Sequence, residues 1–91
     1  MRALRVALNN KKLCLAGIDN GGVLTAIVSW VTSSGRDELS LEVAGLVSAT
    51  NEDVRWINQR PLRVGDELRI KILEVPSVDE PIKRHRSDPD S

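Results

Sequence analysis

The sequence predicts an α+β fold in which one helix packs on a mixed sheet of four to five strands. Residues 3–8 and 11–18 open the chain with the two-residue apolar period of half-buried strands, and residues 67–72 repeat that period near the end. Between them, residues 23–32 place apolar side chains at helical spacing. A sheet with one apolar face needs a covering layer, and this helix would supply it.

The first two strands are expected to form a hairpin closed at residues 9–10, because two asparagines tolerate the positive φ angles of a type I′ turn. A two-residue turn fixes the register, so Leu8 would pair with Lys11 and Val6 with Leu13. The opposite face of this hairpin would then carry Arg5, Ala7, Lys12, Cys14 and Ala16.

Residues 23–32 allow two interpretations. As a helix, positions 24, 27, 28 and 31 form one apolar stripe, with a capping side chain at Asp19 or Asn20 and a stop at residues 33–35. As a strand, the segment would bury both faces, and its many β-branched residues favour that state. We expect the helix. The alternative is a strand within an all-β small barrel or sandwich.

The remaining segments give three further expectations. Residues 39–44 alternate as a strand, and residues 54–57 are expected to form a short edge strand. Residues 61–66 form a turn before the last strand. The globular domain is therefore expected to span residues 1–75, and the polar, proline-containing residues 76–91 are expected to form a disordered tail.

This order of elements resembles the β-grasp architecture of ubiquitin-like and sulfur-carrier proteins. The segment 61–68, PLRVGDEL, resembles the stretch before the last strand of small sulfur carriers, and residues 41–45 are similar to a third strand of ubiquitin type. The resemblance implies a β-grasp-like domain over residues 1–75. The sequence ends without the Gly-Gly of conjugated members, so we expect neither conjugation nor sulfur transfer. One cysteine excludes the four-cysteine ferredoxin branch.

Composition narrows the function classes. The 91 residues have room for one domain, and 13 basic and 13 acidic residues cancel, which is not the charge footprint of most nucleic-acid binders. The single cysteine allows no intramolecular disulfide and indicates a cytoplasmic protein. The first residues lack the apolar core of a signal peptide, and the apolar run 23–31 is too short to span a membrane.

Catalysis is not expected. A nucleophilic Cys14 would need a neighbouring base, and the only histidine, His85, lies in the expected tail. The sequence contains no zinc-ligand spacing, phosphate-binding loop or dinucleotide-binding glycine motif. We therefore expect no enzyme activity, no cofactor and no metal.

The open sheet face is the candidate site. If the first and last strands are neighbours, the basic side chains of that face lie together, and they are Arg5, Lys12, Arg69 and Lys71. Such a surface suits an acidic protein partner, because charge complementarity raises association rate and specificity. Trp56 is expected either to be partly exposed and serve as an interface anchor or to pack over an edge of the core.

These residues predict a non-catalytic protein-binding module, resembling ubiquitin-like proteins, that docks a partner through its open sheet face. A small immunity protein or antitoxin-type inhibitor of a neighbouring enzyme fits the same compact, neutral chain. A third interpretation is a nucleic-acid-binding small barrel, although no aromatic platform accompanies the basic residues.

Overall fold

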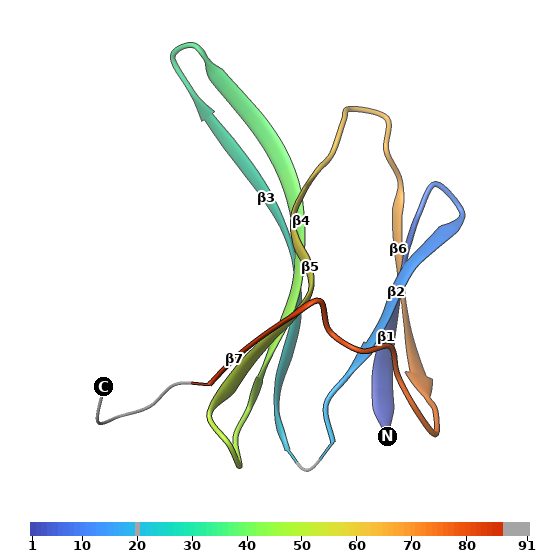
Figure 1. Ribbon diagram of the computed structural model, residues 1–91. Helices are drawn as coiled ribbons and strands as arrows, with labels where there is room; N and C mark the ends of the chain where they lie inside the picture. Colours follow the sequence, from blue (N-terminus) through green and yellow to red (C-terminus); the bar gives the residue numbers. More distant parts are fainter. Residues whose placement is uncertain (20, 87–91) are drawn as a thin grey trace.

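The chain folds into two antiparallel sheets that face each other (Figure 1). The computed structural model describes residues 1–19 and 21–86, and over these residues it contains no helix, hence none that could cross a membrane. The strands are β1 (Arg2–Leu8), β2 (Lys11–Gly17), β3 (Gly22–Ser33), β4 (Arg36–Val47), β5 (Glu52–Pro61), β6 (Leu68–Glu74) and β7 (Lys83–Arg86). Sheet A has the order β2-β1-β6, and sheet B has the order β3-β4-β5-β7. The predicted β-grasp-like α+β fold is therefore wrong, and the all-β alternative agrees with the structure.

Residues 23–32 belong to strand β3 and not to the predicted helix. β3 pairs with β4 without interruption from Gly22 opposite Val47 to Ser33 opposite Arg36. The turn between them ends at Gly35, whose φ of 75° suits glycine. Six of the ten residues are Val, Ile or Thr, whose branched side chains favour an extended backbone. The covering layer that a one-faced sheet requires is supplied by the second sheet.

The N-terminal hairpin follows the prediction at its turn and departs from it further along. Asn9 and Asn10 have φ angles of 51° and 69°, as a type I′ turn requires, and Leu8 pairs with Lys11. The register then shifts by one residue, so that Val6 lies opposite Cys14. This irregularity turns Cys14 and Ala16 inward, whereas the regular register would have placed both on the outer face.

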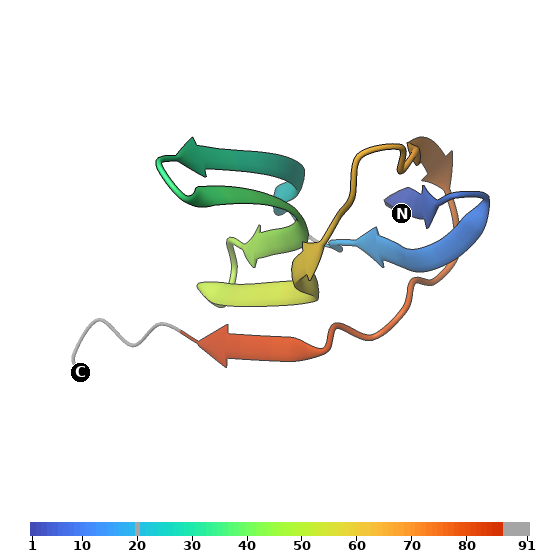
Figure 2. The same ribbon diagram turned by 90° about the horizontal axis from the view of Figure 1, so that it is seen from above.

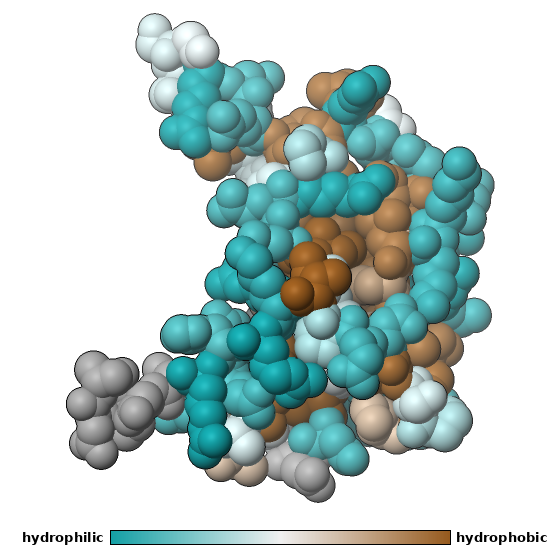
Figure 3. Space-filling view, viewed as in Figure 1, coloured by the Kyte–Doolittle hydropathy of each residue, from teal (hydrophilic) through white to brown (hydrophobic). Residues whose placement is uncertain are grey.

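The core lies between the two sheets. Sheet A contributes mainly small side chains, and sheet B contributes larger ones. The buried cluster consists of Val6, Cys14 and Ala16 from sheet A, with Leu41, Val43, Val54, Trp56 and Ile57 from sheet B. Figure 3 shows apolar side chains filling the space between the sheets, with hydrophilic side chains on both flanks.

Residues 75–82 form a strap that connects β6 in sheet A to β7 in sheet B. The Asp79 amide donates to the Leu15 carbonyl at 2.9 Å, and the Leu15 amide donates to Asp79 Oδ2 at 2.8 Å. The indole Nε1 of Trp56 donates to the Asp79 carbonyl at 2.7 Å. The structure thus differs from the expected disordered tail, because β7 pairs with β5 and ordered contacts reach residue 86. Residues 87–91 of that tail lie outside the described residues.

Candidate functional site

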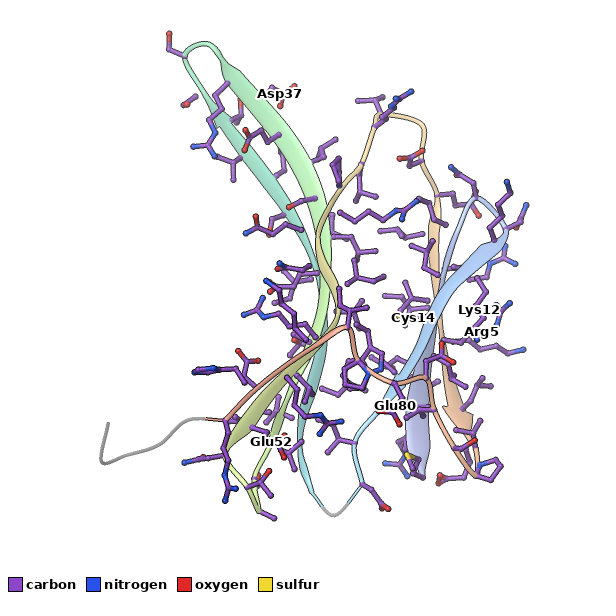
Figure 4. All side chains as sticks on the ribbon, in the orientation of Figure 1. Arg5, Lys12, Cys14, Asp37, Glu52 and Glu80 are labelled. Carbon is purple, nitrogen blue, oxygen red and sulfur yellow. The ribbon has the colours of Figure 1, made fainter. Side chains whose placement is uncertain are left out.

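Four basic side chains gather on the outer face of sheet A. The β1–β6 pairing sets Arg5 opposite Lys71 and Ala7 opposite Arg69, while the β1–β2 pairing sets Ala7 opposite Lys12. Residues opposite one another point to the same side of a sheet, so the four cations share one surface. Figure 4 shows Arg5 and Lys12 projecting away from sheet B, and Cys14 projecting towards it. We call the surface formed by Arg5, Lys12, Arg69 and Lys71 the basic face.

The charges of the basic face are only partly compensated. Lys12 Nζ lies 3.3 Å from Asp79 Oδ2, and Arg69 Nη2 lies 3.6 Å from Glu67 Oε1. Within residues 1–19 and 21–86, neither Arg5 nor Lys71 has a carboxylate partner. Like charges directly opposite each other destabilise a strand pair, so the centre of the basic face carries two unneutralised cations at an energetic cost.

Small or half-buried apolar side chains surround these cations on the outer face of sheet A. Ala3 and Ala7 are buried on β1, and Leu15 and Leu73 are half-buried on the flanking strands. The pairings Ala3 with Leu73 and Arg5 with Leu15 place these apolar groups on the same side as the cations. A sheet face with cations above an apolar floor offers a docking surface and not a concave small-molecule pocket.

Asp79 borders the basic face and remains ionised at neutral pH. The hydrogen bond from the Leu15 amide to its carboxylate, followed by the contact with Lys12, holds the pKa of Asp79 below its ordinary value. The same side chain anchors the strap and neutralises Lys12. A partner docking on this surface would therefore find its strongest uncompensated charge at Arg5 and Lys71.

The two tryptophans lie in contrasting environments. Trp56 is 6% exposed and belongs to the core, which agrees with packing and not with a partly exposed anchor. Trp30 is 67% exposed on β3, where its Nε1 donates to Asp37 Oδ1 at 2.6 Å. Sequence reasoning did not propose Trp30 as a site residue, because it assigned residues 23–32 to a helix that packs on the sheet. The signal that could have found it is the absence of charge along residues 22–33.

Cys14 and His85 lie in different sheets. The Cys14 thiol is buried in the core, and burial, followed by the nearby Asp79 carboxylate, raises its pKa to about 11. His85 lies on β7, opposite Asp53. A thiol with such a pKa is almost entirely protonated at neutral pH, which makes it a poor nucleophile and a poor metal ligand. Within the described part of the chain, no three His, Cys, Asp or Glu side chains converge to hold a metal ion.

Comparisons of the chain with models of known protein families, with curated proteins and with solved structures find no significant match. The resemblance to ubiquitin-like proteins depended on a helix at residues 23–32, and these residues form β3. The chemistry of the basic face is therefore interpreted from its own geometry and charge.

Proposed function

We propose that this chain is a non-catalytic protein-binding module that docks an acidic protein surface on its basic face. The observation that carries the proposal is the pairing of Arg5 with Lys71, two like charges directly opposite each other without a carboxylate partner among the described residues. An acidic partner supplies the missing counter-charges and removes the repulsion between them. Binding and relief of repulsion then act in the same direction.

The surroundings of the basic face favour a protein over a nucleic acid. Single-stranded nucleic acids are held by aromatic side chains beside cations, and both tryptophans of this chain belong to sheet B. The chain has no Tyr or Phe, and its formal net charge is zero. We place the interaction in the cytoplasm, since the one cysteine is a free thiol.

Titration with poly-L-glutamate at low ionic strength tests the proposal. Isothermal calorimetry compares the unmodified chain with the double variant Arg5→Glu, Lys71→Glu. We expect the unmodified chain to bind and the double variant to bind about tenfold more weakly, equivalent to ~1.4 kcal/mol. Added salt should weaken binding of the unmodified chain, because exposed charges are screened.

A matched control separates the site from overall charge. The double variant Lys83→Glu, Arg86→Glu makes the same change in net charge on exposed residues of β7, at the far edge of sheet B. Its affinity should stay within about twofold of the unmodified chain. Equal loss in both double variants, or no binding by the unmodified chain, would overturn the proposal. Preference for single-stranded DNA over poly-L-glutamate would assign the face to nucleic acid instead.

A further inference from the structure

Three of the four sheet edges are protected against pairing with another strand. β7 is short and entirely basic in character, with the sequence KRHR. β2 begins with two lysines and is bordered by the strap, and β6 carries Arg69, Lys71 and Glu74. Charged side chains, short length and covering segments are the usual means by which proteins protect sheet edges. The fourth edge, β3, extends over 12 residues without a charged side chain.

The apolar side chains of β3 are exposed on both faces of sheet B. They account for half of the large apolar side chains that are exposed in the described part of the chain. These are Val23, Ile27, Val28, Trp30 and Val31. Figure 2 shows β3 and β6 towards the same side of the molecule, with β7 towards the opposite side. An uncharged, apolar and long edge strand is suited to pairing with a further strand.

The hydrogen-bonding pattern between β3 and β4 shows which backbone amides and carbonyls of β3 are available for that pairing. The Ser48 amide donates to the Gly21 carbonyl at 3.3 Å, and the register sets Gly22 opposite Val47 and Ser33 opposite Arg36. In an antiparallel ladder the hydrogen-bonded pairs alternate, so odd-numbered residues of β3 direct their amides and carbonyls to β4. The even-numbered residues direct theirs outward, and they include Leu24, Ala26, Val28 and Trp30.

The side chains of β3 are symmetric in character about Ile27. Reversing the strand about this residue matches apolar with apolar and hydroxyl with hydroxyl. The matched positions are Val23 with Val31, Leu24 with Trp30, Thr25 with Ser29, and Ala26 with Val28. The numbers of each pair have the same parity, so matched residues lie on the same face of the sheet. A two-fold axis at Ile27 would therefore pair this strand with its own copy in a consistent register.

We propose that β3 is a homodimer interface, at which two copies of this chain pair their β3 strands antiparallel about a two-fold axis through Ile27. Sheet B then continues into its copy as one sheet of eight strands. The outward amides and carbonyls of Leu24, Ala26, Val28 and Trp30 become the hydrogen-bonded pairs of the new ladder. Ile27 faces Ile27 of the second copy at a pair without hydrogen bonds.

A second copy fits this edge better than an unrelated strand for two reasons. The symmetric, uncharged pattern is complementary to itself, and a chain of zero net charge has little overall repulsion against its own copy. The pairing also brings the exposed indole of Trp30 of the second copy beside Leu24, on the same face of the sheet. Leu24 lines a cavity of about 320 Å³ with Leu4 and Ile72, on the open side between the sheets.

The mass of the full chain in solution, measured by sedimentation equilibrium over a range of concentrations, tests the dimer. We expect a mass of twice 10.0 kDa for the unmodified chain. Ile27→Lys sets two ammonium groups against each other at the axis, whereas within one copy the new lysine lies opposite Glu42 and is tolerated. It should raise the dimer dissociation constant about 100-fold or more. Val64→Lys, at a position 95% exposed between β5 and β6, is the matched control and should leave the dimer unchanged.

A cysteine scan tests the register independently of charge. Cα atoms of a pair without hydrogen bonds lie about 4.5 Å apart, within the range of a disulfide, so Ile27→Cys should form a covalent dimer on mild oxidation. Ser29→Cys should not, because its own copy lies about 13 Å away along the strand. The buried Cys14 keeps the unmodified chain uncrosslinked. A monomeric unmodified chain, a dimer that survives Ile27→Lys, or crosslinking through Ser29→Cys in place of Ile27→Cys would each overturn the proposal. None of these outcomes depends on the basic face.

Discussion

Two cross-strand pairs of sheet A show how the charge of a single residue can affect folding stability and partner binding in opposite directions. β1 and β6 set Arg2 opposite Glu74, an attractive pair, and Arg5 opposite Lys71, a repulsive one. The two pairs lie on opposite faces of sheet A, because positions 2 and 5 of β1 differ in parity. The repulsive pair lies at the centre of the basic face, where the proposed partner would dock.

Arg5→Glu should therefore stabilise the isolated chain while weakening partner binding. It converts the pair with Lys71 from repulsive to attractive, and we expect the free energy of unfolding to rise by about 0.5 kcal/mol. Arg2→Glu is the matched control, because it makes the pair with Glu74 repulsive and should lower stability by a similar amount. Urea denaturation of both variants measures the two effects. A destabilised Arg5→Glu chain would mean that packing of the arginine stem outweighs the charge.

Asp79 makes stability dependent on pH in the acid range. Its pKa in the folded state is lowered, first by the Leu15 amide and then by Lys12, so its stabilising contribution is complete above the pKa of the unfolded chain. That contribution is lost as pH falls through the lowered pKa of the folded state. We expect Asp79→Asn to be less stable than the unmodified chain at pH 7, and the difference to shrink below about pH 4. A constant difference across this range, in thermal unfolding, would contradict the assignment.

At the scale of elements, the strap joins the two sheets and covers Trp56. Asp79 of the strap makes two hydrogen bonds with the backbone of Leu15 on β2, and its carbonyl accepts a third from the Trp56 indole. β7 then extends sheet B from Glu52 opposite Arg86 to Arg55 opposite Lys83. The strap and β7 are thus structural parts of the domain.

Truncation after Pro76 should be strongly destabilising. It removes the hydrogen bonds of Asp79, each of which contributes about 1 kcal/mol, and it exposes the Trp56 ring. We expect the free energy of unfolding to fall by about 3 kcal/mol or more, with a red shift of Trp56 fluorescence. Ile82→Ser is the control, because it changes an exposed position of the strap (67% exposed) and leaves the hydrogen bonds of Asp79 in place. A truncated chain of unchanged stability would show that the strap is dispensable.

The elements also show what the sequence could and could not predict. The turn at residues 9–10 and the strand near the end were predictable, because asparagine at positive φ and two-residue alternation are local properties. β3 was not, since its helical stripe and its β-branched composition favour different states, and only pairing with β4 decides between them. Strand alternation alone was enough to predict which residues share the basic face, because Arg5, Arg69 and Lys71 lie at alternate positions of strands whose pairing is regular. Cys14 was misplaced, because the register shift is invisible to periodicity.

At the scale of the whole molecule, folding depends on contacts between distant parts of the chain. Sheet A is complete only when Arg2 meets Glu74, after the chain has crossed to sheet B and returned. The chain crosses between the sheets after β2, after β5 and after β6. Neither sheet can therefore be completed without the other.

Refolding should consequently be slow for so small a chain. Two-state proteins dominated by non-local strand pairing refold in roughly milliseconds to seconds, and we expect this range here. Stopped-flow fluorescence of Trp56 after dilution from urea measures the rate, with Trp30→Leu removing the signal of the exposed indole. If the whole change in Trp56 fluorescence occurred within the mixing time, formation of the local hairpins alone would determine the folding rate.

The tip of the β3–β4 hairpin gives a practical site for engineering. Ser34 and Gly35 are exposed at the end of the hairpin, which extends well beyond the rest of sheet B (Figure 1), and a Cβ added at Gly35 would meet no atom within 4 Å. Exposed turns with small residues tolerate insertions. A peptide epitope or a fluorophore-labelling sequence inserted between Ser34 and Gly35 would therefore leave the core and the basic face intact. Because both chain ends remain unmodified, such a reporter could follow the protein without altering the strap.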